Sequence, residues 1–451
     1  MKTLIVGNGG RESALAKRMA ESSSLHAFMR HANPSLIEEA RRTNGKWEIG
    51  NILNPKEVAR FARKYGIDIV MVSADDPLAA GVVDALLKEK IPTVGPTKKG
   101  AQIEWDKVYS RKLIGKVAPE ANPFFRIART KRQVERIFEE VGDLEVAVKP
   151  RGLTGGKGVK VMGPHLRDKE EAKKYALEIL ESGVGGGGAV IIEERIEGVE
   201  FTLQAITDGK TIIFPPATYD HPYRFENDTG PGTGGMGAYS MATPNLPFMS
   251  LEQYTRVCEI TRKTIDELKA QGRHFNGVLN GGFFISQRGI RVIEFNARFG
   301  DPECMNIMTL LASDWVNVMV KIHEQRLTVD DLKFNGNASV TIYLVSPDYA
   351  IREGRAYTFE LDKEAIENEG CRVFFSSAVA TERKDMFTTV GTSRSVGLAV
   401  SDPDVFRARE LIGACIERYF KGPLQWRKDI ATREAVDKTV RHVQNLLSGK
   451  L

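Results

Sequence analysis

A glycine-rich loop flanked by two short strand patterns is the feature that most restricts the fold of this chain. Residues 146–162 read Val-Ala-Val-Lys-Pro-Arg-Gly-Leu-Thr-Gly-Gly-Lys-Gly-Val-Lys-Val-Met, with apolar residues alternating on both sides of the loop, which predicts two strands. The loop glycines around Lys157 are Gly152, Gly155, Gly156 and Gly158. Glycine lets backbone N–H groups approach an anion, and lysine adds a compact positive charge. We expect a phosphate-binding flap, with Lys149 pointing at the same anion; a glycine-rich surface hairpin is the alternative.

The loop lacks the pattern of a Walker P-loop. No glycine stands five residues before Gly156, Gly158 occupies the position that requires Ser or Thr, and a strand pattern follows where a helix should begin. A hairpin that clamps phosphates from above is the better interpretation.

Length and composition are those of an ordinary globular protein. The 451 residues suffice for about three domains, and 42% are hydrophobic and 27% charged. The net charge of +5 is spread over 64 basic and 59 acidic residues, so we expect small acidic substrates and no nucleic acid. No apolar run approaches a membrane span, and a strand pattern begins at once without a signal peptide. We therefore expect a cytoplasmic protein with no membrane partner.

The four cysteines are far apart and have no metal-binding spacing; they are Cys258, Cys304, Cys371 and Cys415. We expect reduced thiols that pack in the core.

The first 100 residues follow the pattern of a doubly wound parallel sheet. A strand at residues 2–6 runs into Gly9-Gly10-Arg11-Glu12 and a helix pattern, and three more strand–helix units follow. A glycine turn at a helix N-terminus suits a phosphate, with Arg11 as a second clamp. Glu12 occupies the third glycine position of the dinucleotide fingerprint, so a mononucleotide or sugar phosphate is expected. A turn that serves packing alone is the alternative.

Ligands of such sheets lie beyond the carboxyl ends of the strands. Asp75 stands at one of these ends, within Ser73-Ala74-Asp75-Asp76-Pro77-Leu78. It is a candidate to bind a ribose hydroxyl or an amine, whereas Asp76 reads equally well as a helix cap.

A second α+β unit begins near residue 102. It contains Lys107 early in a helix pattern, the glycine loop, and a strand at residues 189–194 that ends in Glu193 and Glu194. Residues 195–200 are either a solvated hinge or a hinge whose backbone reads an adenine edge while Glu200 takes the ribose hydroxyls.

Residues 230–240 read Gly-Pro-Gly-Thr-Gly-Gly-Met-Gly-Ala-Tyr-Ser and follow Asp220-His221-Pro222 after a short interval. So long a run without a helix or strand pattern is normally functional or disordered. Met236 and Tyr239 argue against disorder, so we expect an anion nest or a substrate loop.

Two strand patterns, at residues 277–286 and 289–297, carry the candidate metal site. The period of two places Glu294, Asn296 and Arg298 on one face of the second strand. Carboxylate and amide oxygens suit Mg²⁺, which binds few protein oxygens and leaves its other positions to phosphates and water. Arg298 is placed to stabilise charge on a phosphoryl group during transfer. An ordinary amphipathic edge strand is the alternative.

The last part of the chain is mostly β with two helix patterns, and its only candidate site is Trp426-Arg427-Lys428-Asp429. We therefore predict three domains. They are residues 1–101 (α/β), residues 102–334 with the glycine loop in a subdomain at about 124–196, and residues 335–451 (mixed, mostly β).

Four motifs, in this order, resemble the ATP-grasp superfamily and, within it, the phosphoribosylamine–glycine ligases (glycinamide ribonucleotide synthetases). They are Gly9-Gly10-Arg11-Glu12, Gly155-Gly156-Lys157-Gly158, residues 233–240 and residues 294–303. Two further segments, residues 150–155 and residues 193–202, look most like the archaeal branch of the family. The resemblance covers essentially the whole chain. It implies an α/β and α+β multidomain protein with an N-terminal pre-ATP-grasp sheet, a central ATP-grasp fold of two α+β subdomains and a C-terminal mostly β domain.

The resemblance also implies an ATP-dependent ligase of purine biosynthesis. ATP would phosphorylate the carboxylate of glycine, and the amine of 5-phosphoribosylamine would attack the acyl phosphate. The products would be glycinamide ribonucleotide, ADP and phosphate. Mg²⁺, or Mn²⁺, would be held by Glu294 and Asn296, and the chain would be a monomer or a homodimer.

Roles for individual residues follow from the same resemblance. The catalytic residues would be Lys157 and Arg298. ATP would be bound by Lys107, Lys149, Gly155, Gly156, Lys157, Gly158, Glu193, Glu194, Ile196 and Glu200. The other substrates would be bound by Gly9, Gly10, Arg11, Glu12, Asp75, Asp220, Gly234, Gly235, Met236, Gly237 and Asp301.

Three positions depart from the family pattern. Ser13 replaces the usual His after the first motif, residues 73–78 replace Gly-Pro-Glu-x-Pro-Leu, and Gly282 stands where archaeal relatives tend to carry a glutamine that could join the metal shell. Two alternatives remain open: an ATP-grasp ligase that joins a different carboxylate and amine, and a non-enzymatic ATP-binding module.

Overall fold

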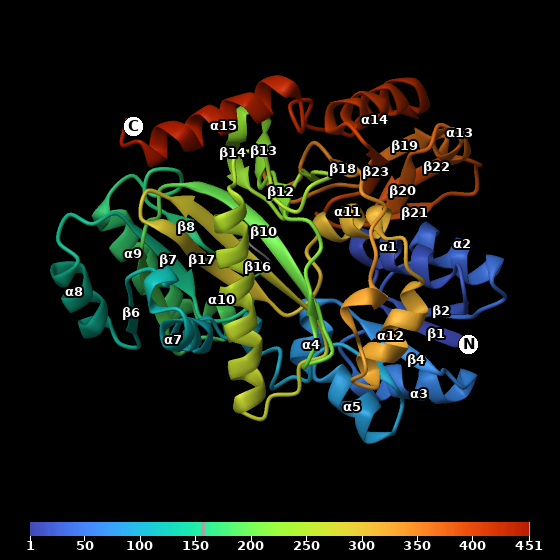
Figure 1. The fold of residues 1–451 in the computed structure, drawn as a ribbon, viewed down its shortest axis with the longest axis horizontal. Coiled ribbons are helices and arrows are strands. Elements are labelled where there is room, and N and C mark those ends of the chain that lie inside the picture. Colours follow the sequence, from blue (N-terminus) through green and yellow to red (C-terminus); the bar gives the residue numbers. More distant parts are fainter. Residues whose placement is uncertain (155–157, 451) are drawn as a thin grey trace.

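The computed structural model describes residues 1–154 and 158–450, arranged as Figure 1 shows. The N-terminal part is a five-stranded parallel sheet in the order β3-β2-β1-β4-β5, which confirms the expected doubly wound sheet. Its strands are β1 (Lys2–Val6), β2 (Ser24–Met29), β3 (Trp47–Ile49), β4 (Ile69–Val72) and β5 (Thr93–Val94). Its helices are α1 (Gly10–Met19), α2 (Pro34–Arg42), α3 (Pro55–Tyr65), α4 (Asp75–Ala80) and α5 (Val82–Lys88). The central strands are buried almost throughout, because helices cover both faces of a parallel sheet.

The glycine loop belongs to a small antiparallel sheet in the order β6-β9-β7-β8, which forms the teal lobe in Figure 1. Its strands are β6 (Phe125–Ala128), β7 (Val146–Pro150), β8 (Lys160–Val161) and β9 (Val190–Glu194). Helices α8 (Lys131–Glu140) and α9 (Lys169–Ser182) pack with the sheet around an apolar core of their own. Strand β7 pairs with β8 in antiparallel register, so the predicted strand–loop–strand hairpin is confirmed.

A nine-stranded sheet runs through the middle of the molecule in the order β17-β16-β10-β12-β15-β18-β23-β20, with β11 beside β10. Its strands are β10 (Val199–Thr207), β11 (Ile212–Ile213), β12 (Thr218–Asp220), β15 (Gly237–Ser240), β16 (Gly277–Ser286), β17 (Gly289–Asn296), β18 (Ala338–Leu344), β20 (Arg372–Phe375) and β23 (Val396–Asp402). Because β15 pairs with β18, the sheet crosses residue 335 without a break. The domain bounds therefore stay a prediction.

Helices and smaller sheets surround this central sheet. The helices are α6 (Gln102–Trp105), α7 (Lys107–Val117), α10 (Leu251–Ala270), α11 (Glu303–Leu310), α12 (Trp315–His323), α13 (Lys363–Asn368), α14 (Val405–Tyr419) and α15 (Arg433–Leu447). A four-stranded sheet contains β19 (Thr358–Leu361), β21 (Ala378–Ala380), β22 (Met386–Thr389) and β24 (Phe420–Lys421). In the described residues, no helix is both long and apolar enough for a membrane span.

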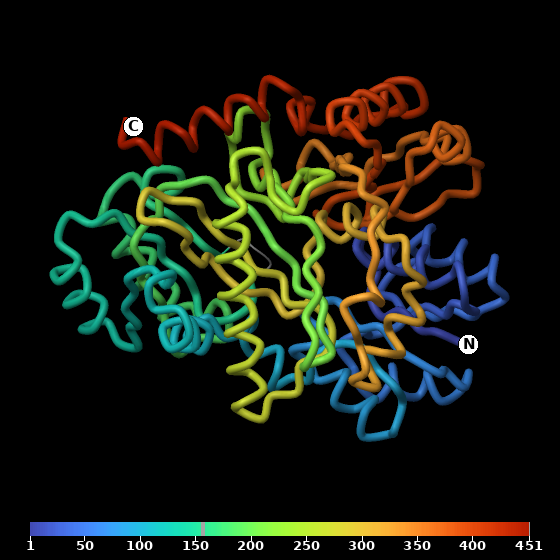
Figure 2. The backbone as a smooth tube through the Cα atoms, in the orientation of Figure 1, coloured from blue at the N-terminus to red at the C-terminus, as the bar shows by residue number. Residues whose placement is uncertain are grey.

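The run at residues 230–240 is more regular than the sequence pattern indicates. It contains β14 (Thr229–Gly232), which pairs with β13 (Tyr223–Phe225), and the strand β15 of the central sheet. The tube in Figure 2 shows this segment in light green beside the C-terminal part in orange and red. The pairing partner β18 lies about 100 residues later in the chain, so no local pattern announces the strand.

Candidate active site

Three buried charged side chains connect the small sheet β6-β9-β7-β8, here called the flap sheet, to the central sheet. Glu193 on β9 accepts hydrogen bonds from Arg111 Nε (2.6 Å) and Nη2 (2.8 Å), and Lys149 Nζ on β7 lies 2.7 Å from Glu193 Oε2. Arg111 also donates to the backbone carbonyls of Val292 (3.0 Å) and Ile293 (2.6 Å) on β17. Burial alone would raise the pKa of Glu193, but Arg111 and Lys149 lower it to about 2. Glu193 therefore stays ionised and fixes the position of Lys149.

The base of the flap is attached to the start of α7. Asp106 caps this helix by accepting from Val108 N and Tyr109 N, both at 3.2 Å. Its two carboxylate oxygens also accept from Arg151 Nε (3.0 Å) and Nη2 (2.6 Å). Lys107 Nζ donates to Gly152 O at 3.0 Å. The helix cap thus holds both Lys107 and the first loop glycine in place. Lys157, Gly155 and Gly156 lie outside the described residues.

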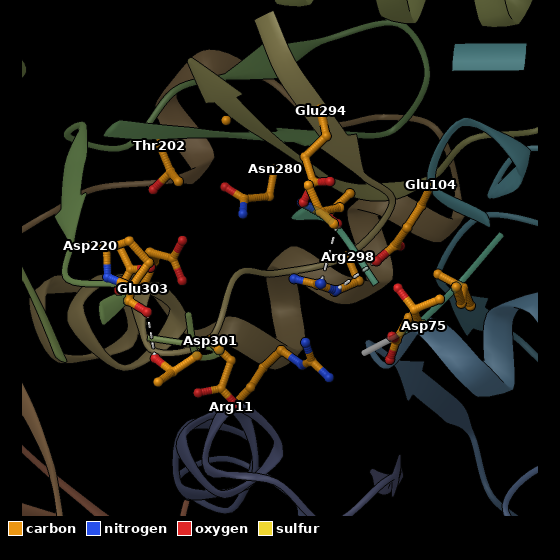
Figure 3. A pocket seen from close by; sticks show the side chains of 18 of the residues that line it. Arg11, Asp75, Glu104, Thr202, Asp220, Asn280, Glu294, Arg298, Asp301 and Glu303 are labelled. Carbon is orange, nitrogen blue, oxygen red and sulfur yellow. Dashed lines mark hydrogen bonds and ion pairs between the residues drawn. The ribbon is translucent and has the colours of Figure 1, made fainter. Parts of the chain in front are cut away.

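The main cavity has a volume of about 460 Å³ and lies between the flap sheet, the central sheet and the N-terminal part. Figure 3 shows its side chains, and they are strongly polar. Predicted site residues that line it are Arg11, Asp75, Lys107, Glu200, Asp220, Gly234, Glu294, Asn296, Arg298 and Asp301. Further lining residues, for which the sequence analysis predicts no role, include Glu104, Thr202, Asn280, Glu303, Ser393 and Arg394.

Strand β17 presents the candidate metal ligands as the period of two predicts. Asn296 Nδ2 donates to Glu294 Oε1 at 3.2 Å, and Asn296 Oδ1 accepts from Arg298 Nη2 at 3.3 Å. Burial would raise the pKa of Glu294, but Lys107, Lys149 and Arg298 lower it. In the described part of the chain, no three His, Cys, Asp or Glu side chains form a metal-binding group. An ionised carboxylate and an amide oxygen still fit Mg²⁺ on a nucleotide, because phosphates and water supply most of its ligands.

Arg298 lies near the centre of Figure 3, on the same side of the cavity as Glu104 and Asp75. Its Nε is 3.0 Å from Glu104 Oε1, an ion pair without the alignment of a hydrogen bond, while Glu104 Oε2 accepts from the backbone N–H of Ala297 at 2.8 Å. Burial raises the pKa of Glu104 to about 7 although Arg298 opposes this. Burial would also raise the pKa of Asp75, but Arg298 and Arg11 lower it. Asp75 is thus an ionised carboxylate between two arginines.

Three carboxylates converge at the other end of the cavity. Burial raises the pKa of Glu200 to about 7, with a further contribution from the charge of Glu294. The pKa values of Asp220 and Glu303 are raised by burial and, for Asp220, by Glu303 and Glu200. Asn280 Oδ1, buried beside them, has no hydrogen-bond partner among the described residues. So many acceptors around one space favour a cationic ligand.

Asp301 joins the main cavity to the C-terminal part. Its Oδ1 accepts from Tyr343 Oη at 2.6 Å and lies 3.4 Å from Arg394 Nη2. Arg394 lies over the Tyr343 ring at 4.6 Å from the centroid. A Cβ on Gly10 would stand 2.1 Å from Tyr343 Oη. Glycine is therefore needed at position 10 to make room for the tyrosine.

A second cavity of about 250 Å³ adjoins the first beside the β1–α1 turn. Five residues line both cavities: Arg11, Asp75, Asp301, Ser393 and Arg394. The other residues that line the second cavity are Gly7, Asn8, Gly9, Glu12, Arg30, Ile52, Ala74, Asp76, Pro77, Ser376 and Ser377. The first turn of a ten-residue helix, α1, faces this space, which suits an anion. These five shared residues place the two cavities side by side.

Several predicted substrate residues have structural contacts instead of an open face. Glu12 accepts from Gly9 N (2.7 Å) and Arg11 Nε (2.7 Å), so it caps α1 and orients Arg11. Met236 is fully buried in the core. Gly235 and Gly237 have φ values of +102° and +158° and leave no room for a Cβ. Gly235, Met236 and Gly237 thus fix the shape of the loop that contains Gly234.

The hinge residues after β9 are held by the neighbouring strands. Glu194 accepts from Arg288 Nη2 at 2.7 Å and from Phe124 N at 3.1 Å. Its own N–H donates to Phe124 O at 3.0 Å. The side chain of Glu194 thus makes hydrogen bonds to neighbouring strands, and Ile196 is half-buried.

Gly158, at the far end of the glycine loop, donates from its N–H to Thr154 Oγ1 at 3.2 Å.

Two of the departures from the family pattern lie in packed positions. Ser13 is fully buried and donates to Phe375 O at 2.5 Å, and Ser73 Oγ accepts from Phe299 N at 3.3 Å. Gly282 lines the main cavity, where a Cβ would meet only ordinary contacts of 3.6 Å or more.

Family models match most of the chain. Residues 1–104 match "Phosphoribosylglycinamide synthetase, N domain" and residues 105–304 match "Phosphoribosylglycinamide synthetase, ATP-grasp (A) domain". The phosphoribosylamine–glycine ligase of Methanothermobacter thermautotrophicus is 39% identical over 450 residues, covering 99% of this chain and 100% of the relative. The phosphoribosylamine–glycine ligase of Pyrococcus horikoshii is 37% identical over 447 residues, covering 99% and 98%.

Solved structures share the fold. The phosphoribosylamine–glycine ligase of Thermotoga maritima has a TM-score of 0.78 and 21% identity, covering 95% of this chain and 100% of that chain. The biotin carboxylase domain dimer of Hydrogenobacter thermophilus 2-oxoglutarate carboxylase, solved with MgADP and bicarbonate, has a TM-score of 0.70 and 17% identity, covering 100% and 95%.

Proposed function

This chain belongs to the phosphoribosylamine–glycine ligase family, and from that premise we propose how its residues divide the work of the reaction. The reaction is the ATP-dependent ligation of glycine to 5-phosphoribosylamine, in which ADP and phosphate are released. Two bonds must form in sequence: a glycine carboxylate oxygen takes the terminal phosphoryl group of ATP, and the amine nitrogen then displaces phosphate from the acyl carbon. Positioning and charge neutralisation carry such chemistry without a covalent nucleophile.

The ATP phosphates are assigned to the flap end of the main cavity. Lys107 lines this cavity, and Lys149 lies in a small adjoining space that Lys107 and Glu294 also line. Both lysines supply fixed positive charge, because Gly152 O and Glu193 hold their ammonium groups. The flap glycines and Lys157 are assigned to the same phosphates from their sequence pattern, since Gly155, Gly156 and Lys157 lie outside the described residues. The adenine edge is assigned to the backbone between Glu194 and Ile196, since the Glu194 side chain is engaged by Arg288.

Glu294 and Asn296 are assigned to Mg²⁺, with Mn²⁺ as a substitute that accepts the same oxygen ligands. A metal held there would neutralise phosphate charge, which would let a carboxylate approach the terminal phosphorus. Arg298, beside both ligands, stabilises the phosphoryl group during transfer. Glu104 holds Arg298 in this orientation.

Glycine is assigned to the opposite end of the main cavity. Its ammonium group meets the carboxylates of Glu200, Asp220 and Glu303, whose pKa values are raised first by burial and then by neighbouring carboxylates. Its carboxylate then points back towards Arg298. Glu200 takes this role in place of the ribose contact, because it faces Glu294 and Glu303.

Phosphoribosylamine is assigned to the second cavity. The β1–α1 turn and Arg30 receive the 5-phosphate. Asp75, ionised and on the shared wall, holds the amine where it can cross into the main cavity. The observation that carries this assignment is that Arg11, Asp75 and Asp301 line both cavities. We further propose a cytoplasmic protein that is a monomer or a homodimer.

ADP release by the purified protein tests this assignment. Phosphoribosylamine is generated in the assay from ribose 5-phosphate and ammonia. We expect ADP to appear only when glycine, phosphoribosylamine and Mg²⁺ are all present, and chelation of the metal by EDTA to stop turnover until Mg²⁺ is restored. Turnover that is independent of glycine or of phosphoribosylamine would exclude the proposed substrates.

Lys157→Ala is expected to raise the KM for ATP or to lower kcat by about tenfold or more, because the flap loses its only charge between Gly155 and Gly158. The measurement is steady-state kinetics with ATP varied at saturating glycine. Lys169→Ala, a lysine at the start of α9, is the matched control. Kinetics equal to the wild type in Lys157→Ala would mean that the loop is only a turn.

A further inference from the structure

The segment of residues 220–237, here called the substrate loop, brings four residues to the main cavity: Asp220, Pro222, Thr233 and Gly234. Between them the chain leaves the cavity as the β13–β14 hairpin. A two-stranded hairpin is marginally stable without support from other elements. The position of Asp220 and Gly234 therefore depends on what holds the hairpin.

Arg427 holds the hairpin from the C-terminal part of the chain. Only 2% of this residue is exposed. Its Nη1 donates to Tyr223 O (3.0 Å) and to Asp228 Oδ1 (2.8 Å). Its Nε and Nη2 donate to the two carboxylate oxygens of Asp429 at 2.9 and 2.6 Å. A guanidinium group with four such bonds is fixed in one orientation.

Further hydrogen bonds join the segment around Arg427 to the β13–β14 hairpin. Asp429 Oδ2 also accepts from the backbone N–H of Asn227 at 2.9 Å, and Lys428 N donates to Glu226 Oε1 at 3.2 Å. Burial would raise the pKa of Asp228, but contacts with His221 and Arg427 lower it well below its usual range. Residues 427–429 thus contact the hairpin through both backbone and charge.

Arg394 holds the other end of the substrate loop. Its Nη1 donates to Gly234 O, to Gly235 O (3.2 Å) and to Asp301 O (2.6 Å). The loop that contains Arg394 precedes β23 and lies about 160 residues beyond Gly234 in the chain. Both arginines lie after residue 304, beyond the segments that the family models match.

We propose that Arg427 and Arg394 are positioning residues that hold the substrate loop in its binding conformation, so that the C-terminal part of the chain sets the affinity for glycine but not for ATP. The proposal rests on the assignment of glycine to Asp220 under the proposed function. The ATP phosphates are assigned to β7, α7 and β17, none of which contacts Arg427 by hydrogen bond or ion pair in the described residues. Release of the hairpin should therefore leave ATP binding unchanged.

Arg427→Lys is the test, since lysine keeps the charge but cannot make four directed hydrogen bonds. We expect the KM for glycine to rise tenfold or more, the KM for ATP to stay within twofold, and amide hydrogen exchange in residues 223–235 to accelerate while α10 is unchanged. Arg418→Lys, whose ion pair with Glu369 lies elsewhere in the C-terminal part, is the matched control. Asp429→Asn, which preserves the shape of the contact, replaces Arg427→Lys if that variant does not fold.

Two results would overturn the proposal: a KM for glycine within twofold of the wild type, or equal rises in the KM values for glycine and ATP. Asp220→Asn separates this outcome from failure of the proposed function. An unchanged KM for glycine in Asp220→Asn removes the glycine assignment itself. A raised KM in Asp220→Asn together with wild-type kinetics in Arg427→Lys removes only the role of the arginine.

Discussion

Replacement of Glu294 by glutamine will abolish ligase turnover while the protein remains folded. The carboxylate is ionised, because Lys107 and Lys149 oppose the effect of burial on its pKa. Glutamine keeps the size of the side chain and can still accept from Asn296 Nδ2, so the packing of β17 should persist. What is lost is the negative charge that a metal ion needs. We expect kcat to fall by about 10³-fold or more, measured as ADP release in saturating Mg²⁺.

The control for Glu294→Gln is Glu252→Gln, a glutamate in the first turn of α10. It should leave both kcat and the melting temperature unchanged, because surface charges contribute little to stability. Circular dichroism and the melting temperature establish that each variant is folded. A Glu294→Gln variant with the wild-type rate in Mg²⁺ would rule out the assignment of the metal to this strand.

Strand β17, which carries the candidate metal ligands, shows which parts of the site can be predicted from sequence. The side-chain period of a strand is a local property, so the common face of Glu294, Asn296 and Arg298 follows from the residues themselves. The parallel sheet and the flap hairpin were predictable for the same reason, since strand and helix periods are local. The family motifs then led to ATP-dependent glycine ligation, which the full-length relatives support.

Contacts between segments that are far apart in the sequence could not be predicted in this way. Arg394 reaches Gly234 across 160 residues, and no spacing or motif announces the pair. Glu12 shows a second limit: it follows the glycine turn like a ligand-binding residue, yet it caps its own helix. Arg111 is an intermediate case, because it follows Lys107 by four positions and so shares its helix face. That spacing was a usable signal.

Replacement of Arg111 by methionine is expected to have the largest effect on stability. Arg111, Glu193 and Lys149 are nearly inaccessible to solvent, with side chains 4%, 3% and 10% exposed. Methionine removes both hydrogen bonds to Glu193 and leaves the carbonyls of Val292 and Ile293 without their donor. Removal of one partner of a buried ion pair costs about 3–5 kcal/mol of unfolding free energy. The melting temperature measured by calorimetry should fall by roughly 3–5 °C, because the unfolding entropy of a chain of 451 residues is about 0.95 kcal/mol/K.

An exposed pair of the same residue types provides the control for Arg111→Met. Arg126 and Glu140 form an ion pair in which both side chains are more than 40% exposed, so Arg126→Met should cost less than about 1 kcal/mol. Arg111→Met should also raise the KM for ATP. Of the described residues, Lys149 then remains as the only cation paired with Glu193 and is drawn away from the phosphates. If Arg111→Met lowers the melting temperature no more than Arg126→Met does, the buried triad is not what joins the flap sheet to the central sheet.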